Sequence, residues 1–454
     1  MKKNVINRNY NTKKIIETTL IIFGIFLTLQ ITFKTSMTLK PWADEIIALT
    51  SNISFFRSLD FLPSTSYNNF SYALTSGILS SVGGVFGWVL TKNFIIARVS
   101  NFIYVFFVQL CMSFYIFKNN EKYKFNYFVF FSLTQFLLIP WWFSSLYFIA
   151  EVISTLIFVN SLFLYNKNPK VSVFLMGCSV IFGKFLMLIP TVLFLISKIK
   201  IKEIKKNLIQ LLFYLLPFCF WYLLIYIKIG EGGFYIYLNE FFGTLFVRED
   251  SGVQSAFNLT YNTFIYNLNN SEVASWTTAS LLRAAFSPIL FLIIYFQNRD
   301  YLEDKLNVSF VSVFVGISGT YLWFWILSPP KFIRQSTHFV LLVIFVSLYI
   351  FLYTDLKNKY YKFLILFNLS LFFSDLRLIL AFNLFTGIYY FILNEKIKNL
   401  FDIKLFFVVF LVLNLLNINF EVNSKDTFNL DLPSCSQDIF SKKCVDDYLF
   451  SLYE

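Results

Sequence analysis

Trp42-Ala43-Asp44-Glu45-Ile46-Ile47-Ala48-Leu49 places two adjacent carboxylates a few residues after the first long apolar segment, which runs from about Ile15 to Thr32. The chain around them is strongly apolar, with 57% hydrophobic and 14% charged residues and a mean hydropathy of +0.64. Charge beside or inside a membrane is costly, so two neighbouring carboxylates need a reason. The octapeptide therefore predicts where the first span has ended and where a functional site begins.

The composition predicts an all-α polytopic membrane protein. The 454 residues include 61 Phe and 27 Tyr, and apolar runs of about 17–25 residues recur, each long enough to cross hydrocarbon as a helix. The first run is long enough to remain as an anchor, so we expect no cleaved signal peptide. The net charge of +12 does not indicate a nucleic-acid partner, because the basic residues cluster in short loops between apolar runs, as the positive-inside rule describes.

The basic loops predict a topology with a cytoplasmic N-terminus and about 13 spans. The apolar run 171–197 is divided into two spans because both of its flanks are basic, which favours a short hairpin over one crossing. The predicted spans cover 15–36, 94–117, 124–141, 145–165, 171–186, 187–197, 208–228, 279–296, 308–327, 337–353, 360–374, 377–393 and 401–419. The whole of 1–419 forms one membrane domain in this prediction, with external loops at 40–91 and 230–278.

A short extracytoplasmic tail, 420–454, completes the predicted topology. It contains Cys435 and Cys444, and an oxidising compartment leaves both a disulfide and two free thiols open. Cys111, Cys178 and Cys219 lie in apolar spans and are expected to be small core residues. The chain has one His, His338, which is expected at the outer end of a span and not as a metal ligand.

The first external loop has the pattern of an interfacial helix. Ile46, Leu49, Ile53 and Phe56 recur at helical spacing with polar residues between them, which predicts an amphipathic helix in the outer interface. A second helix is expected from about Ser71 to Leu90, weakened by its four glycines. Carboxylates at the start of the first helix also suit the helix dipole, which accounts for one acidic residue better than for two.

These features resemble the GT-C superfamily of membrane glycosyltransferases, in the branch of the protein O-mannosyltransferases and the lipid A aminoarabinose transferases. Those families carry an Asp-Glu pair directly after the first span, followed by interfacial helices. The string 42–49 matches that pair, and residues 71–100, ending in Ala97-Arg98-Val99, resemble the second interfacial helix and the start of the second span. Weaker likeness extends to Phe182-Gly183-Lys184 and to Pro329-Pro330-Lys331-Phe332-Ile333-Arg334, so it covers about the first 350 residues.

The chain also departs from these families. Asn68-Asn69-Phe70-Ser71 stands where the aminoarabinose transferases have Lys-Pro. The phosphate or acceptor contact that the resemblance implies for this position is therefore in doubt. The large soluble C-terminal domains of related enzymes are not expected here, so oligosaccharyltransferase activity is not implied.

The resemblance implies sugar transfer from a polyprenyl-phosphate-linked donor to a lipid, glycan or protein of the cell envelope. A carboxylate must take the acceptor proton, and Asp44 is the expected base, with Glu45 as its helper or as a metal ligand. A divalent cation, Mg²⁺ or Mn²⁺, would suit Asp44 and Glu45 but is not required. The leaving phosphate needs cations. The candidates are Lys184, Lys331, Arg334 and Arg98, with Arg57 and Arg283 in support. Glu151, near the outer end of the fourth predicted span, is a candidate partner for one of these cations.

Two other classes of protein remain open from the sequence. A flippase or transporter for lipid-linked sugars would place ionisable residues in mid-membrane and break paired helices, whereas most charges here lie at span ends. A polysaccharide polymerase would place its catalytic loops later, and the loop 230–278 keeps that reading open. Asp375 and Arg377, between two late spans, are expected to form an ion pair with each other.

Overall fold

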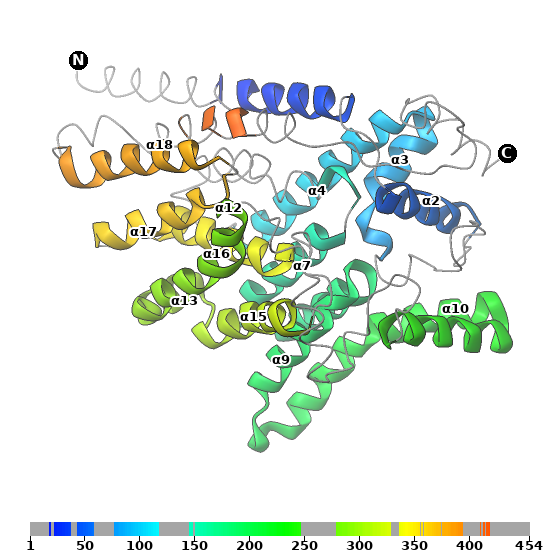
Figure 1. Ribbon diagram of the computed structural model, residues 1–454. Helices are drawn as coiled ribbons and strands as arrows, with labels where there is room; N and C mark the ends of the chain where they lie inside the picture. The colour runs from blue at the N-terminus through cyan, green and yellow to red at the C-terminus, as the bar shows by residue number, and fades with distance from the viewer. Residues whose placement is uncertain are drawn as a thin grey trace, which may run out of the picture.

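The computed structural model describes residues 22–37, 43–58, 77–117, 145–246 except 149, 278–327, 336–393 except 355, 357 and 374, and a few isolated positions near residue 18 and between 409 and 417. Most of these residues are helical, and no strand occurs among them. Figure 1 shows the helices as one bundle, with α17 and α18 on one side and α2, α3 and the second half of α10 on the other.

The N-terminal half contains the helices that build the candidate site. They are an apolar helix Ile22–Met37, α2 Ala43–Ser58, η2 Ile78–Ser80, α3 Val82–Thr91, α4 Phe94–Phe117, α7 Ala150–Leu164, α8 Pro169–Cys178, η4 Ser179–Gly183, η5 Phe185–Met187, α9 Leu188–Lys198, η6 Ile201–Glu203 and α10 Ile204–Phe246.

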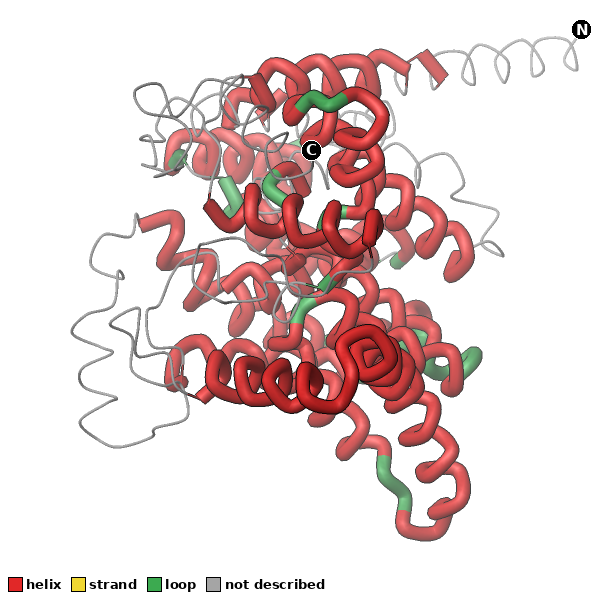
Figure 2. Tube along the Cα trace, turned by 90° about the vertical axis from the view of Figure 1, so that its right-hand side faces the viewer, coloured by secondary structure: helices red, strands yellow, loops and turns green. Residues whose placement is uncertain are grey.

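The C-terminal half completes the bundle. Its helices are α12 Thr278–Leu281, η9 Leu282–Phe286, α13 Ser287–Gln297, α14 Arg299–Leu306, α15 Phe310–Leu322, η10 Trp323–Leu327, α16 Thr337–Tyr353, α17 Lys359–Ser370, α18 Leu376–Gly387 and η12 Ile388–Ile392. Figure 2 shows the same helices turned by a quarter, with short loops between many of them.

Two helices form the centre of the bundle. Every residue of α7 is buried, and α16 is buried from Thr337 to Ile350, because both are apolar around their whole circumference. Three polar residues tie them to α4: the Tyr349 hydroxyl donates to Asn160 Oδ1 at 3.1 Å, and Gln109 lies 3.4 Å from each of them. The core therefore includes one uncharged polar cluster.

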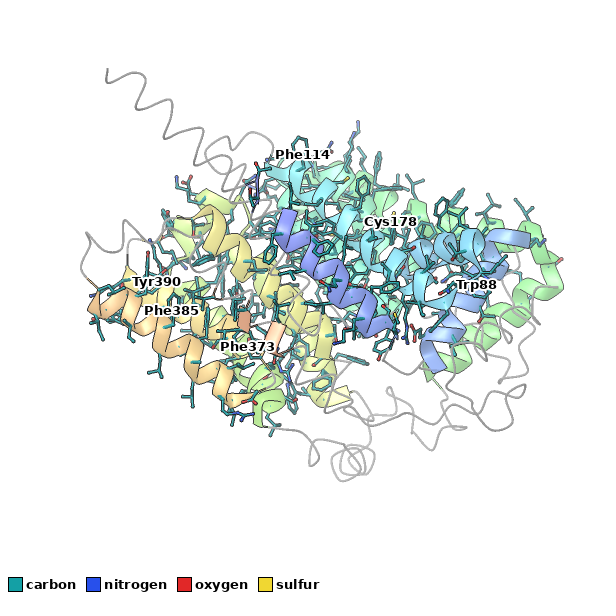
Figure 3. All side chains as sticks on the ribbon, turned by 90° about the horizontal axis from the view of Figure 1, so that it is seen from above. Trp88, Phe114, Cys178, Phe373, Phe385 and Tyr390 are labelled. Atoms are coloured by element: carbon teal, nitrogen blue, oxygen red, sulfur yellow. The ribbon has the colours of Figure 1, made fainter. Side chains whose placement is uncertain are left out.

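The outer helices present apolar side chains outward, as a membrane protein requires. On α10, Leu212, Phe220 and Ile227 are each more than half exposed, and Figure 3 shows Phe114 of α4 projecting from the outer surface. By length and composition, Phe94–Met112 and Ile204–Lys228 can cross a membrane, and a third span arises if α14 and the helix after it, bent by 96°, count as one. The remaining apolar helices described are shorter, at 10–17 residues, so the number 13 stays a prediction.

The predicted hairpin in the run 171–197 is confirmed. Ser172 Oγ donates to the Ser161 carbonyl, whereas Lys184 lies beside Glu151, so α8 and η4 run antiparallel to α7. The chain then returns, because the Phe194 ring on α9 lies 5.0 Å from the ring of Tyr165 at the end of α7. Lys184 therefore stands at the turn of the hairpin.

The structure adds detail to two of the predicted external segments. Segment 230–278 begins with a helix, since helical structure resumes after a break at Gly230, which has φ 70° and ψ −179°, and continues to Phe246. Only glycine adopts that conformation readily, so Gly230 separates two helical parts of α10 at a kink. The glycines of α3 do not merely weaken it: a Cβ at Gly83 would lie 2.4 Å from Tyr104 Cβ of α4, so they allow the two helices to pack closely.

Candidate active site

Glu45 and Arg98 form a buried ion pair that joins α2 to α4. Arg98 Nε and Nη2 donate to Glu45 Oε1 and Oε2, each at 2.6 Å, and the side chains are 0% and 1% exposed. Arg98 Nη1 also donates to the carbonyl of Ser36 at 3.1 Å, near the end of the first apolar helix. One guanidinium thus fixes three segments in the two-pronged geometry that is strongest for arginine and carboxylate.

Two aromatic rings enclose the guanidinium of Arg98. The Phe94 ring centre lies 4.7 Å away and the Tyr147 ring centre 5.3 Å away. Such stacking is attractive and leaves less room for water beside the cation. Arg98 is therefore engaged by a carboxylate, a carbonyl and two rings at once.

A layer of neutral hydrogen bonds continues from the ion pair along α2. Asn52 Nδ2 donates to Ser81 Oγ at 2.6 Å. Asn101 Nδ2 donates to the carbonyls of Ser80 and Ser145 at 3.2 Å and 2.8 Å. Since Asn52 and Asn101 are both buried, these bonds offset part of the lost hydration and hold α2, η2 and α4 together, although Asn52 Oδ1 has no partner among the described residues.

Lys184 and Glu151 form a second, less complete ion pair. Lys184 has extended backbone between the π-helical η4 and the 3₁₀-helical η5. Its Nζ lies 3.5 Å from Glu151 Oε1, with side chains 22% and 6% exposed. Glu151 Oε2 is buried with no hydrogen-bond partner among the described residues. A buried carboxylate with one unsatisfied oxygen is an unusual arrangement, and such places are often functional.

A close backbone contact connects the two ion pairs. The Gly77 N–H, just before η2, donates to the Gly183 carbonyl at 2.6 Å. A Cβ on Gly183 would lie 2.7 Å from Ser154 Cβ on α7, and one on Gly77 would lie 2.2 Å from the Phe182 carbonyl carbon. The hairpin turn that carries Lys184 is thus pressed between η2 and α7, at the same end of the bundle as Glu45.

Several predicted site residues lie outside the described residues. Asp44 and Arg57 belong to helix α2, but their side chains are outside the described set, as are Lys331 and Arg334 entirely. Arg283 is described within η9, where its Nη2 donates to Ser280 Oγ at 3.1 Å. Cys435 and Cys444 also lie outside the described residues.

The predicted face of α2 is partly wrong. Ile46, Leu49 and Ile53 are buried as expected, but Phe56 is 47% exposed and its neighbour Phe55 is buried instead. The buried face also takes in the polar Glu45, Thr50 and Asn52, because each finds a hydrogen-bond partner there. A simple amphipathic pattern cannot anticipate polar side chains that face inward.

The described residues also include Asp375, Arg377 and His338. Asp375 and Arg377 pair with each other at 2.5 Å, which confirms their predicted ion pair. His338 lies in the first turn of α16 and is buried. No group of three His, Cys, Asp or Glu side chains suited to a metal occurs in the described part of the chain.

The geometry also bears on Glu45 as a metal ligand. Both of its carboxylate oxygens accept hydrogen bonds from Arg98, and a cation there would face the guanidinium at close range. In this arrangement Glu45 does not fit a divalent cation, and its position is that of an anchor for the first turn of α2.

Sequence reasoning did not find Asn52, Asn101 or Tyr147. The only signal for Asn101 is an amide inside the long apolar run of α4, a position where a polar side chain requires a buried partner.

Comparison with known proteins supports the fold. No protein-family model matches the chain, and no curated protein matches it in sequence. Among solved structures, the crystal structure of ArnT from Cupriavidus metallidurans bound to undecaprenyl phosphate is similar, with a TM-score of 0.52 and 11% identity over 89% of this chain and 77% of that one. The chain is a multi-pass membrane protein with a GT-C-like fold, as the resemblance predicted.

Proposed function

We propose that this protein is an integral-membrane glycosyltransferase that transfers a sugar from a polyprenyl-phosphate-linked donor to a cell-envelope acceptor on the extracytoplasmic side. The observation that carries the proposal is the Glu45–Arg98 pair, which anchors the first turn of α2 at the same end of a GT-C-like fold as Lys184. ArnT, the protein of similar fold, was crystallised with undecaprenyl phosphate.

The two neighbouring carboxylates take different roles in this proposal. Glu45 is the anchor, because both of its oxygens accept from Arg98 in a dry environment and its negative charge is already compensated by the guanidinium. Asp44, one residue earlier in the same helical turn, is the base that removes the proton from the acceptor hydroxyl as it attacks the anomeric carbon. A single displacement of this kind inverts the anomeric configuration.

Lys184 is the proposed partner of the leaving phosphate. A phosphate leaves without a general acid but needs positive charge as the glycosidic bond breaks. The Lys184 ammonium is partly exposed and lies 3.5 Å from Glu151, a distance longer than a good charged hydrogen bond, so a phosphate can compete for it. Lys331, Arg334 and Arg57 remain candidates for the same task, whereas Arg98 serves the anchor.

The orientation follows the positive-inside rule. Lys167, Lys198, Lys200 and Lys305 gather at the opposite end of the helices from Glu45 and Lys184, and we call that end the basic end. The basic end is proposed to face the cytoplasm, and the donor, acceptor and C-terminal tail to lie on the other side.

The proposal is tested by Asp44→Asn, with Asp375→Asn as the matched control. Asp375 is also an acidic residue at a helix start, where its side chain accepts from the Arg377 N–H, and asparagine caps helices as well as aspartate does. In purified protein, transfer of labelled sugar from polyprenyl-phosphate donors should fall by about 10²-fold or more in Asp44→Asn. Asp375→Asn should keep the activity.

Full transfer activity in a folded Asp44→Asn variant would overturn the role of Asp44. The alternative is a flippase. It would be favoured if wild-type protein in vesicles moved lipid-linked sugar across the membrane but transferred it to no acceptor. The anomeric configuration of the product, read by NMR, tests inversion independently of the variants.

A further inference from the structure

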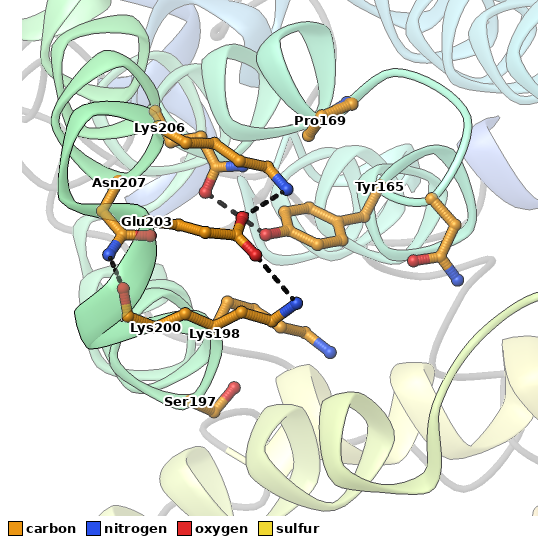
Figure 4. A pocket seen from close by; sticks show the side chains of 10 residues that line it. Tyr165, Pro169, Ser197, Lys198, Lys200, Glu203, Lys206 and Asn207 are labelled. Carbon is orange, nitrogen blue, oxygen red and sulfur yellow. Dashed lines mark hydrogen bonds and ion pairs between the residues drawn. The ribbon is translucent and has the colours of Figure 1, made fainter.

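A polar cavity of about 420 Å³ lies at the basic end of the bundle, remote from the Glu45 end. Four segments enclose it: the end of α7, the start of α8, the end of α9, and η6 with the first turns of α10. Figure 4 shows Glu203 between Lys200 and Lys206, with Tyr165 and Lys198 beside them. No part of the proposed transfer reaction uses this cavity.

The cavity carries an excess of positive charge. Lys200 and Lys206 donate to the two oxygens of Glu203 at 3.3 Å and 2.8 Å, and Lys198 donates to Ser309 Oγ at 3.0 Å. Lys198 also interacts electrostatically with Glu303, so three ammonium groups lie near two carboxylates, and each ammonium has three donors. A tetrahedral anion can accept from several of them at once, so the chemistry of the cavity matches a phosphate.

Exposed apolar residues lie next in the chain to residues that line the cavity. Ile199, Ile204 and Leu208 alternate in the chain with its lining residues, and each is more than half exposed. Such side chains face the lipid in a membrane protein, so the polar cavity opens at the level where headgroups meet acyl chains. A soluble anion would use the lysines only, whereas a lipid would use both surfaces.

We propose that this cavity binds the phosphate headgroup of an anionic phospholipid, whose acyl chains lie along the apolar face of α10. Basic pockets between helices at a cytoplasmic surface suit such headgroups. Glu203 is a competing acceptor in this site: it orders Lys200 and Lys206 and lowers their attraction for the lipid. The binding does not depend on the glycosyltransferase activity, and only the choice of leaflet rests on the proposed orientation.

The test is native mass spectrometry of the full-length protein, titrated with phosphatidylglycerol and, separately, with phosphatidylcholine. Wild-type protein should retain phosphatidylglycerol preferentially. Lys206→Gln should lower its affinity roughly fivefold, which corresponds to about 1 kcal/mol for a basic residue near a membrane surface. Glu203→Gln should raise the affinity. Lys202→Gln is the matched control, because Lys202 is an exposed lysine of the same segment that does not line the cavity.

An equal loss in Lys202→Gln and Lys206→Gln would overturn the proposal, because it would show attraction to the general charge of this surface. Equal retention of the two lipids would overturn it as well. A titration with inorganic phosphate distinguishes a lipid site from a site for free phosphate. Displacement of phosphatidylglycerol by millimolar phosphate would identify a site for the free anion and contradict a lipid site.

Discussion

The Glu45–Arg98 pair and the Lys200–Glu203–Lys206 cluster use the same chemistry in opposite surroundings. The first is fully buried and held by two 2.6 Å bonds, while the second is largely exposed. Removing one partner of a buried pair strands a charge without water and costs about 3–5 kcal/mol, whereas an exposed pair contributes about 0–1 kcal/mol. The difference separates a pair that fixes the backbone from one that remains available to a ligand.

Breaking the buried pair should give the largest effect. Arg98→Met leaves Glu45 buried without its cation and also removes the bond to the Ser36 carbonyl, so a loss of about 3–5 kcal/mol in unfolding free energy is expected. Thermal unfolding in detergent, followed by tryptophan fluorescence, measures it. Arg377→Met is the control. Arg377 pairs with Asp375 at an exposed position, so this variant should unfold at nearly the wild-type temperature.

The double variant Glu45→Gln, Arg98→Met sharpens that result. Without either charge, no ion remains to be desolvated, so part of the stability lost in Arg98→Met should return. Equal melting temperatures for Arg98→Met and Arg377→Met would contradict the anchoring role of the buried pair.

A smaller effect is expected at the hairpin turn that carries Lys184. Gly183→Ala places a Cβ 2.7 Å from Ser154 Cβ and 3.0 Å from Ser154 Cα, and overpacking of this kind costs about 1–3 kcal/mol. Adding Ser154→Gly removes the nearer atom and should restore part of the loss. If the turn positions Lys184, transfer activity in Gly183→Ala should fall further than in a variant of equal melting temperature altered elsewhere.

The sequence alone predicted those structural features that are determined by hydrophobic periodicity and by the charge of the loops. The hairpin at 171–197 was predictable because basic residues flank both ends of one apolar run, and the local pair Asp375–Arg377 was predictable because its members are two residues apart. The pairing of Lys184 with Glu151 was partly foreseen, since the sequence indicated that Glu151 would meet one of the proposed cations.

Features that depend on distant contacts were not predictable. Glu45 and Arg98 are 53 residues apart, and nothing in a single sequence states which cation a buried carboxylate will meet. For the same reason the inward polar face of α2 was missed, because Asn52 is stabilised by Ser81 of a different element. Propensity and hydropathy describe each helix, whereas the anchor is a property of three segments together.

The uncharged polar cluster of Gln109, Asn160 and Tyr349 is intermediate between the buried ion pair and the exposed cluster. Tyr349→Phe removes the hydroxyl that bonds to Asn160 and accepts from Gln109, without a buried charge. Polar contacts between membrane helices average about 0.6 kcal/mol and reach about 1.7 kcal/mol, so the loss in unfolding free energy should fall in that range. Tyr360→Phe, at an exposed tyrosine of α17, should change it little, and a loss as large as that of Arg98→Met would contradict the ranking.

The exposed cluster should give the smallest effect, visible as a dependence on pH. Hydrogen bonds from Lys206 and then Lys200 hold the pKa of the Glu203 carboxyl below its ordinary value of 4.5. The unfolded chain therefore binds this proton first as the pH falls, so the contribution of Glu203 to stability is complete above the ordinary pKa and disappears as the pH drops through the lowered one. The melting-temperature difference between wild type and Glu203→Gln should be small near pH 6 and shrink toward about pH 3. A difference that grows on acidification would contradict the assignment, because it would require a native state that takes up the proton more readily than the unfolded chain.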